Sequence, residues 1–209
     1  MALDLSVLIA TVTPRRSLLS RLLWGLTRQD GDFEILIHSS DEVSMGDKFN
    51  AMFEQAQGEF VVCVDDDDYL SDRYMELVLP KLAPMDMDFV GYRILALRNG
   101  AYWFEVEHRG SVMGWGEKLR GVSPKCPVRR DLARKIVFGN DYRSDEVWSS
   151  EVAQLVGPHG YIDRALYVYD WWDDFMLGTN PTDKPERWGN QRNVGSWPFL
   201  TGRIRWIGV

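Results

Sequence analysis

The sequence is poor in cysteine. Cys63 and Cys126 are the two cysteines among its 209 residues, too few for the disulfide framework on which many small secreted proteins depend. Such a composition suits a reducing compartment, where thiols stay reduced. We therefore expect a cytoplasmic protein without structural disulfides.

Long apolar runs are also missing. None approaches the roughly 18 residues that a membrane-spanning helix requires, and Met1 to Asp4 does not open a signal peptide. There is no internal repeat and no low-complexity linker. The net charge of −7 argues against a surface that binds nucleic acids generally, although a local basic patch is compatible with it. We expect a soluble, intracellular protein with no membrane span.

The first half of the chain instead alternates short apolar runs with amphipathic segments. Apolar and β-branched runs predict strands at 6–10, 33–37, 60–64, 88–92, 101–106 and 161–169. Apolar residues at helical spacing predict helices at 18–26, 49–56, 74–78 and 144–156. The third helix would begin at a cap formed by Ser71 or Asp72. Repeated strand–helix units predict an α/β fold with a parallel sheet, and we expect the 101–106 strand to be antiparallel or at an edge.

Four consecutive aspartates, Asp65 to Asp68, directly follow the apolar run at 60–64. A buried strand delivers such carboxylates to the carboxyl edge of its sheet, where open α/β folds bind ligands. Carboxylates this close repel one another unless a cation or water relieves them. The preceding strand favours a site for a hard divalent cation. The alternative is a solvated acidic turn at the start of the next helix.

Polar residues follow the two preceding strands as well. Thr11 and Arg15 lie in the loop after the first strand, and Asp41 and Lys48 follow the second. The carboxyl ends of parallel strands meet at one edge of a sheet, so these groups are expected to converge with the aspartates. We expect a nucleotide to bind in that crevice.

Several segments resemble family 2 glycosyltransferases of the GT-A fold. In that family a helix with lysine or arginine and asparagine precedes an A-x-G-E-aromatic run and an aspartate-rich DxD motif. The matching segments here are GDKFNA at 46–51, AQGEF at 56–60 and VDDDDYL at 64–70. The opening SVLIAT with Pro14 is similar to the family's first strand and base-binding loop, and PVRRDL and DEVW at 127–132 and 145–148 are similar to its acceptor side.

The resemblance covers roughly residues 5 to 170, and it is specific in the first half and looser in the second. It implies a GT-A-type (Rossmann-like) α/β domain at 1–170, with a mostly parallel central sheet flanked by helices. A short tail at 171–209, rich in tryptophan and arginine, would pack on the domain or contact the acceptor.

The resemblance also implies an activity. The chain would be a metal-dependent, inverting glycosyltransferase that moves a sugar from a nucleoside-diphosphate sugar, with a UDP-sugar favoured, to an acceptor hydroxyl. Mn²⁺ or Mg²⁺ would neutralise the phosphates. Glu146 is the first choice for the base that takes the acceptor proton, with Asp145 close behind. The alternative for both is ordinary negative charge at a helix N-terminus.

The remaining roles follow from the same resemblance. Asp67 would bind the metal, with Asp68 in reserve. The nucleotide sugar would contact Thr11, Pro14, Arg15, Asp41, Lys48, Asp65 and Asp66. The acceptor would contact Arg129, Arg130, Trp171 and Trp172.

The sequence departs from the family after its last strand. Many members carry a histidine there that reaches the metal, whereas here Asp170 and two tryptophans follow Tyr169. Either Asp173 or Asp174 replaces that histidine, or the metal relies on Asp67, phosphates and water. We expect the nearby His159 to be a solvated turn residue.

The tail mixes basic and aromatic residues, among them Arg203, Arg205 and Trp206. Arginines with aromatics suit an acceptor surface that contacts phosphate and stacks on sugars or bases. The alternative is that the tryptophans pack the tail onto the domain. The short, anchor-free chain is similar to phage-encoded glycosyltransferases, some of which glucosylate hydroxymethylated DNA bases. A DNA base is therefore one acceptor option, and the host cytoplasm would then be the location.

Three other functions compete with this interpretation. A phosphatase or phosphotransferase of the haloacid dehalogenase type also places Asp-x-Asp after a strand, but it expects threonine or valine where Tyr69 stands. A calcium loop requires glycine where Leu70 stands. The third is a non-catalytic module that binds sugar nucleotides, against which Asp145 and Glu146 argue.

Overall fold

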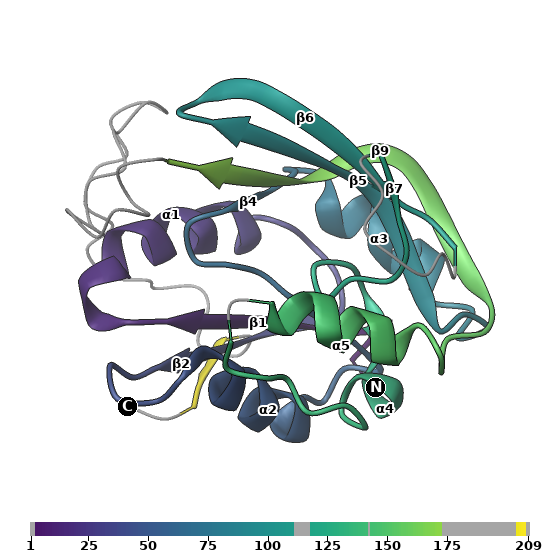
Figure 1. The fold of residues 1–209 in the computed structure, drawn as a ribbon, viewed down its shortest axis with the longest axis horizontal. Coiled ribbons are helices and arrows are strands. Elements are labelled where there is room, and N and C mark those ends of the chain that lie inside the picture. Colours follow the sequence, from purple (N-terminus) through teal and green to yellow (C-terminus); the bar gives the residue numbers. More distant parts are fainter. Residues whose placement is uncertain (1–2, 111–117, 142, 173–203, 208–209) are drawn as a thin grey trace.

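A computed structural model describes residues 3–110, 118–141, 143–172 and 204–207 (Figure 1). Its strands, in chain order, are β1 (Leu5–Thr11), β2 (Phe33–Ser39), β3 (Phe60–Cys63), β4 (Tyr69–Leu70), β5 (Phe89–Arg98), β6 (Ala101–His108), β7 (Leu119–Arg120), β8 (Val128–Arg129), β9 (His159–Trp171) and β10 (Ile204–Trp206). Its helices are α1 (Arg16–Leu26), α2 (Met45–Gln55), α3 (Tyr74–Leu82), α4 (Arg130–Ala133) and α5 (Ser144–Val152). The predicted alternation of strands and helices in the first half is confirmed.

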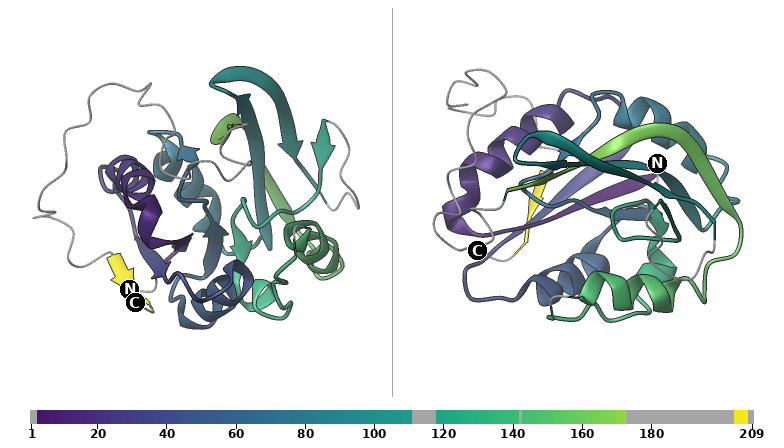
Figure 2. Two further views of the ribbon diagram at one scale, coloured as in Figure 1. Left: turned by 60° about the vertical axis from the view of Figure 1, so that its left-hand side comes forward. Right: turned by 45° about the horizontal axis from the view of Figure 1, so that its top comes forward.

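The strands form one mixed sheet in the order β10-β2-β1-β3-β8-β5-β6-β7, with β9 beside β5 and β4 on β9. β1 runs parallel to β2 and β3, as the strand–helix alternation predicted. β8 then pairs antiparallel with β3 and β5, and β6 is antiparallel to β5. Figure 2 shows the β5–β6 part of the sheet curling over the rest. The expected α/β fold, a central sheet flanked by helices, is confirmed.

Helices cover both faces of the parallel strands, with α1 and α2 on opposite sides of β1 and β2 in Figure 1. Every residue of β1 is buried, as expected for a strand covered on both faces. The predicted apolar stripes are also confirmed. The buried residues of α1 are Leu18, Leu19, Leu22, Leu23 and Leu26, and those of α2 include Phe49, Met52 and Phe53.

Some predicted boundaries are wrong. The N-cap of α3 is Arg73, whose side chain makes no capping bond. Ser71, two residues earlier, accepts a 3.3 Å hydrogen bond from the Arg73 N–H through Oγ and one of 2.9 Å from the Tyr74 N–H through its carbonyl. α5 ends at Val152 rather than at residue 156. β9 begins at His159, since this exposed residue pairs with Phe89 of β5 and is part of the strand. Pairing with β5 sets the limits of β9, and the local sequence does not encode this pairing.

The N-terminal half of α2 packs against the segment that leads into α5 and is hydrogen-bonded to it. A Cβ on Gly46 would lie 2.1 Å from the Gly139 carbonyl oxygen, so only glycine permits this approach. The Asn50 side chain donates a 3.0 Å hydrogen bond to the Phe138 carbonyl and accepts one of 2.8 Å from the Phe138 N–H. The rings of Phe49 and Phe138 lie 5.2 Å apart. These contacts hold the segment that leads into α5 on α2, and the start of α5 lies near the carboxyl end of β3.

β10 extends the sheet by pairing in parallel with β2. Arg205 of this strand donates a 2.9 Å hydrogen bond to the buried Glu34 carboxylate and contacts the Gln55 carbonyl. Ser6 and the Gln57 N–H bind the other oxygen of Glu34. Arg203 and the rest of the basic tail lie outside the described residues. Among the described helices, none has the length and apolarity to cross a membrane.

Candidate functional site

The four aspartates do not share one environment. Asp66 and Asp68 are each only 1% exposed, whereas Asp65 and Asp67 are partly exposed. The buried pair is held by hydrogen bonds from neighbouring strands, and the other two border open space. The cluster is therefore built into the fold and is more than a solvated acidic turn.

Asp66 is bound by the loop that follows β1. Thr11 donates a 2.6 Å hydrogen bond from Oγ1 to Oδ2 of Asp66. Nη2 of Arg15 lies 3.0 Å from Asp66 Oδ1 and 2.7 Å from Asp67 Oδ2. Burial raises the pKa of Asp66 to about 7, and Arg15 and the Thr11 hydroxyl act against this shift. The structure thus brings Thr11, at the end of β1, and Arg15 onto the aspartates, whereas Pro14 does not line either hollow beside them.

Two other predicted donor-side residues support the same loop. Lys48 is 3% exposed, and its Nζ donates a 2.7 Å hydrogen bond to the Thr11 carbonyl. Burial lowers the pKa of Lys48, although Asp41 and Asp66 oppose the shift. Asp41 accepts a 2.7 Å hydrogen bond from the Thr13 N–H, just before Pro14. Both residues therefore hold the loop after β1 in place.

Asp68 is fixed by β9 and by a lysine. It accepts hydrogen bonds of 2.6 Å from the Tyr167 hydroxyl and 3.0 Å from the Asp170 N–H. Lys125 forms an ion pair with Asp65, lies 3.7 Å from Asp68 Oδ2, and donates a 3.2 Å hydrogen bond to Tyr167 Oη. Burial raises the pKa of Asp68, and the Lys125 ammonium counteracts it. For Lys125 itself, burial lowers the pKa, but the Asp65 and Asp68 carboxylates outweigh burial and raise it.

Nothing in the local sequence marks Lys125 as a site residue. It lies in an irregular segment between β7 and β8, and its contacts are with residues far away in the chain. The one available signal is its place just before the 127–132 run, which resembles an acceptor-side segment.

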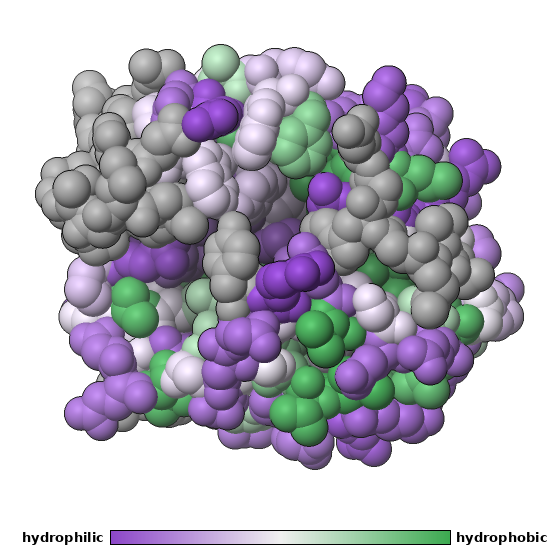
Figure 3. Space-filling model, viewed as in Figure 1, coloured by the Kyte–Doolittle hydropathy of each residue, from purple (hydrophilic) through white to green (hydrophobic). Residues whose placement is uncertain are grey.

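Two hollows meet at Asp65. The larger has a volume of about 490 Å³; Asp65, Lys125 and Asp145 line it together with apolar side chains that include Phe49 and Phe138. The smaller, of about 160 Å³, is lined by Arg15, Asp65, Asp66, Asp67, Tyr169, Asp170, Trp171 and Trp172, among others. Figure 3 shows this face of the molecule hollowed, with hydrophilic side chains gathered there. A further hollow of about 600 Å³ lies beside α1, and Asp72 is the one carboxylate that lines it.

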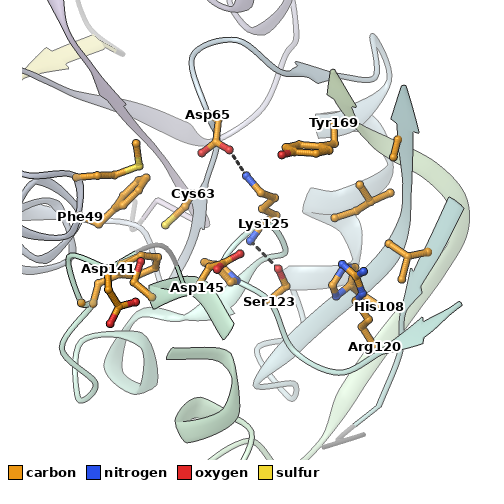
Figure 4. Close-up of a pocket in the computed structure, with 18 of the residues that line it drawn as sticks. Phe49, Cys63, Asp65, His108, Arg120, Ser123, Lys125, Asp141, Asp145 and Tyr169 are labelled. Atoms are coloured by element: carbon orange, nitrogen blue, oxygen red, sulfur yellow. Dashed lines mark hydrogen bonds and ion pairs between the residues drawn. The ribbon is translucent and has the colours of Figure 1, made fainter. Parts of the chain in front are cut away.

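The two candidate bases of α5 point differently. Asp145 lines the larger hollow, and Figure 4 shows it across from Asp65 with Lys125 between them. Burial raises the pKa of Asp145, and Lys125 acts against the shift. Glu146 accepts a 2.6 Å hydrogen bond from Nε of Arg143. Of the pair, Asp145 is the one that faces the hollow.

The four residues predicted to contact the sugar acceptor do not lie together. Trp171 and Trp172 line the smaller hollow. Arg129 contacts Asp131, and Arg130 donates a hydrogen bond to the Ala56 carbonyl, so neither is brought to either hollow. Asp173 and Asp174, the suggested replacements for the missing histidine, lie outside the described residues.

Carboxylate oxygens of Asp65, Asp67 and Asp68 lie within 4.8 Å of one another, the spacing of a candidate metal site among the described residues. Oxygen donors of this kind suit Mg²⁺ or Mn²⁺. Among the described residues, Arg15 and Lys125 form ion pairs with these carboxylates. The donor set therefore fits a hard divalent cation.

No protein-family model and no curated protein matches the sequence. Solved structures do match. S. aureus TarS 1-349 is 18% identical with a TM-score of 0.66, over 80% of this chain and 60% of that one. Its complex with UDP matches with a TM-score of 0.68 at 18% identity over the same shares. Its complex with UDP-GlcNAc matches with a TM-score of 0.66 at 17% identity, over 80% and 58%. The likeness shows a shared fold, and this chain spans about three-fifths of those chains.

Proposed function

We propose that the chain is a glycosyltransferase that uses a nucleoside-diphosphate sugar as donor. The observation that carries the proposal is the larger hollow, in which a carboxylate of the strand-end cluster, Asp65, and the α5 carboxylate, Asp145, line one space. Sugar transfer with inversion needs a site for the diphosphate and a base for the acceptor on opposite sides of the reacting carbon. The TarS structures of the same fold include complexes with UDP and with UDP-GlcNAc, which supports a UDP-sugar donor.

The nucleotide part of the donor would lie in the smaller hollow. Arg15 supplies positive charge there, and Trp171 and Trp172 offer apolar rings on which a base or sugar can stack. Thr11, Asp41 and Lys48 act indirectly, because their hydrogen bonds hold the loop that carries Arg15. Their role is thus to position this loop and Asp66.

Mn²⁺ or Mg²⁺ would be held by Asp67 with Asp65 beside it, since both border the smaller hollow. Bound there, the ion would neutralise the diphosphate as a Lewis acid. Asp68 stays in reserve because Tyr167 and the Asp170 N–H already bind its oxygens.

For transfer with inversion, we propose Asp145 as the base. The acceptor hydroxyl gives its proton to the Asp145 carboxylate and forms a new bond to the anomeric carbon. The bond from that carbon to the phosphate oxygen breaks, and its electron pair stays on the phosphate. The raised pKa of Asp145 suits a group that must accept a proton near neutral pH.

The donor site is tested by thermal shift with UDP, GDP, ADP, CDP and dTDP and their sugar conjugates, with and without Mn²⁺. We expect a metal-dependent shift for one nucleoside, with UDP the first candidate, that disappears in Asp67→Ala. The matched control is Asp72→Ala, which removes an exposed aspartate outside the cluster. No shift with any of these nucleotides would overturn the proposal and leave only the fold.

Catalysis is tested on the nucleotide that binds. Slow hydrolysis of its sugar conjugate, measured as release of the nucleoside diphosphate, is expected of a transferase and absent from a non-catalytic binding module. Release of phosphate from simple phosphoesters would instead indicate a phosphatase.

A further inference from the structure

Lys125 lies where the two hollows meet and has no role in the proposal above. It contacts Asp65, which borders both hollows, yet the lysine itself lines only the larger one. Figure 4 shows it between Asp65 on one side and Asp145 on the other. The bond between the diphosphate and the sugar of a bound donor would lie at this point.

The surroundings of Lys125 hold its side chain in one place. Asp65 and Tyr167 accept two of the three ammonium hydrogens, and the ring of Tyr169 lies 5.8 Å from Nζ. The side chain is nevertheless 18% exposed, and Lys125 lines the larger hollow. An ammonium group has three donors, so one is left for a ligand.

Two roles are compatible with this geometry. In the first, Lys125 is a counter-ion that keeps Asp65 and Asp68 from repelling each other. In the second, it also presents its charge to the ligand. The second explains why the lysine side chain lines the same hollow as the candidate base Asp145, whereas a pure counter-ion has no need to do so.

We propose that Lys125 binds the phosphate that carries the sugar and stabilises it as the leaving group. This assignment rests on the proposed glycosyltransferase function. When the acceptor oxygen bonds to the anomeric carbon, the bond from that carbon to the phosphate oxygen breaks and leaves its electron pair on that oxygen. Lys125 meets the added negative charge as a fixed cation, while the acceptor proton passes to Asp145.

The test compares nucleotides with and without that phosphate. A nucleoside monophosphate lacks the group that Lys125 would bind, whereas the diphosphate carries it. Wild type, Lys125→Met and Lys125→Gln are titrated calorimetrically with UDP and UMP, or with the pair of whichever nucleoside the protein binds. Lys135→Met, which removes an exposed lysine, is the charge-matched control.

We expect Lys125→Met to weaken diphosphate binding by about 10- to 100-fold and monophosphate binding by less than about 3-fold. Lys135→Met should change neither. Lys125→Gln keeps a donor for Asp65 and Tyr167 but no charge, so it should fold and show the same selective loss. If the methionine variant does not fold, the glutamine variant decides the matter.

Equal losses for diphosphate and monophosphate in the Lys125 variants would overturn the assignment and leave the donor site intact. Lys125 would then be a counter-ion for the aspartates. Wild type that binds no nucleoside diphosphate would overturn the glycosyltransferase proposal and this assignment together.

Discussion

Thr11 Oγ1 donates a 2.6 Å hydrogen bond to Oδ2 of Asp66, a residue 55 positions farther along the chain. The bond joins the carboxyl end of β1 to the aspartates that follow β3, and Arg15 strengthens the same junction. It shows that the edge of the parallel strands is a built polar site, and that the β1 loop and the aspartates form one unit.

The two α5 carboxylates should differ in their effect on turnover. Asp145→Asn removes the base that faces the larger hollow, and we expect turnover to fall by about 10²- to 10⁴-fold. Glu146→Gln should stay within a few-fold of wild type, because this side chain is engaged with Arg143. Steady-state rates with a saturating donor and acceptor measure both. The reverse ranking would assign the base to Glu146.

The two hydrogen bonds between Asn50 and Phe138 should matter for stability and for the site. Asn50→Ala removes both hydrogen bonds to Phe138, and we expect about 1–3 kcal/mol less free energy of unfolding, since buried backbone groups lose their partners. Urea denaturation measures the change, with Gln154→Ala, at an exposed turn residue just beyond the end of α5, as the control. An unchanged midpoint would mean that the packing of Phe49 on Phe138 and the hydrogen bonds of Asn140 suffice to hold the 138–141 segment on α2.

His108 should make the protein less stable in mild acid. Burial lowers the pKa of His108 to about 4, and its Nδ1 lies 2.8 Å from the Gly121 carbonyl. Its folded-state pKa is below the unfolded value, so the unfolded chain binds more protons between pH 6.5 and about 4. The contribution of His108 to stability is therefore complete above pH 6.5 and is lost as the pH drops through this window, whereas the raised pKa values of Asp66 and Asp68 act in the opposite direction. His108→Gln should show a shallower fall in chemical denaturation between pH 7 and 4.5; an identical slope would contradict the assignment.

Arg205 should act on stability rather than on nucleic-acid binding. Arg205→Met leaves the buried Glu34 without its cation, and we expect a loss of about 1–3 kcal/mol, reduced in the double variant with Glu34→Gln. Guanidinium denaturation of both variants measures this. If DNA is an acceptor and Arg205 contacts it, Arg205→Met would instead flatten the salt dependence of DNA binding while the unfolding midpoint stays unchanged.

Much of the parallel half of the fold could be predicted from local pattern. The leucines at 18–26 encode a helix by their spacing, and the apolar, β-branched run at 60–64 encodes a buried strand by its composition; both signals are local. Aspartates directly after a strand must lie at the edge of its sheet. The contacts of Thr11 and Arg15 with Asp66 agree with this expectation.

Local sequence pattern was thus enough to predict β1, β2, β3 and the helices α1 to α3, and the end of the sheet that carries the aspartates, but not the short strand β4. The tertiary structure alone decided which carboxylates are buried, which of Asp145 and Glu146 faces the hollow, and that Lys125 joins the cluster. The physical reason is that burial and ion pairing depend on partners distant in the chain. Lys125 and Asp65 are 60 positions apart, and no spacing rule connects them.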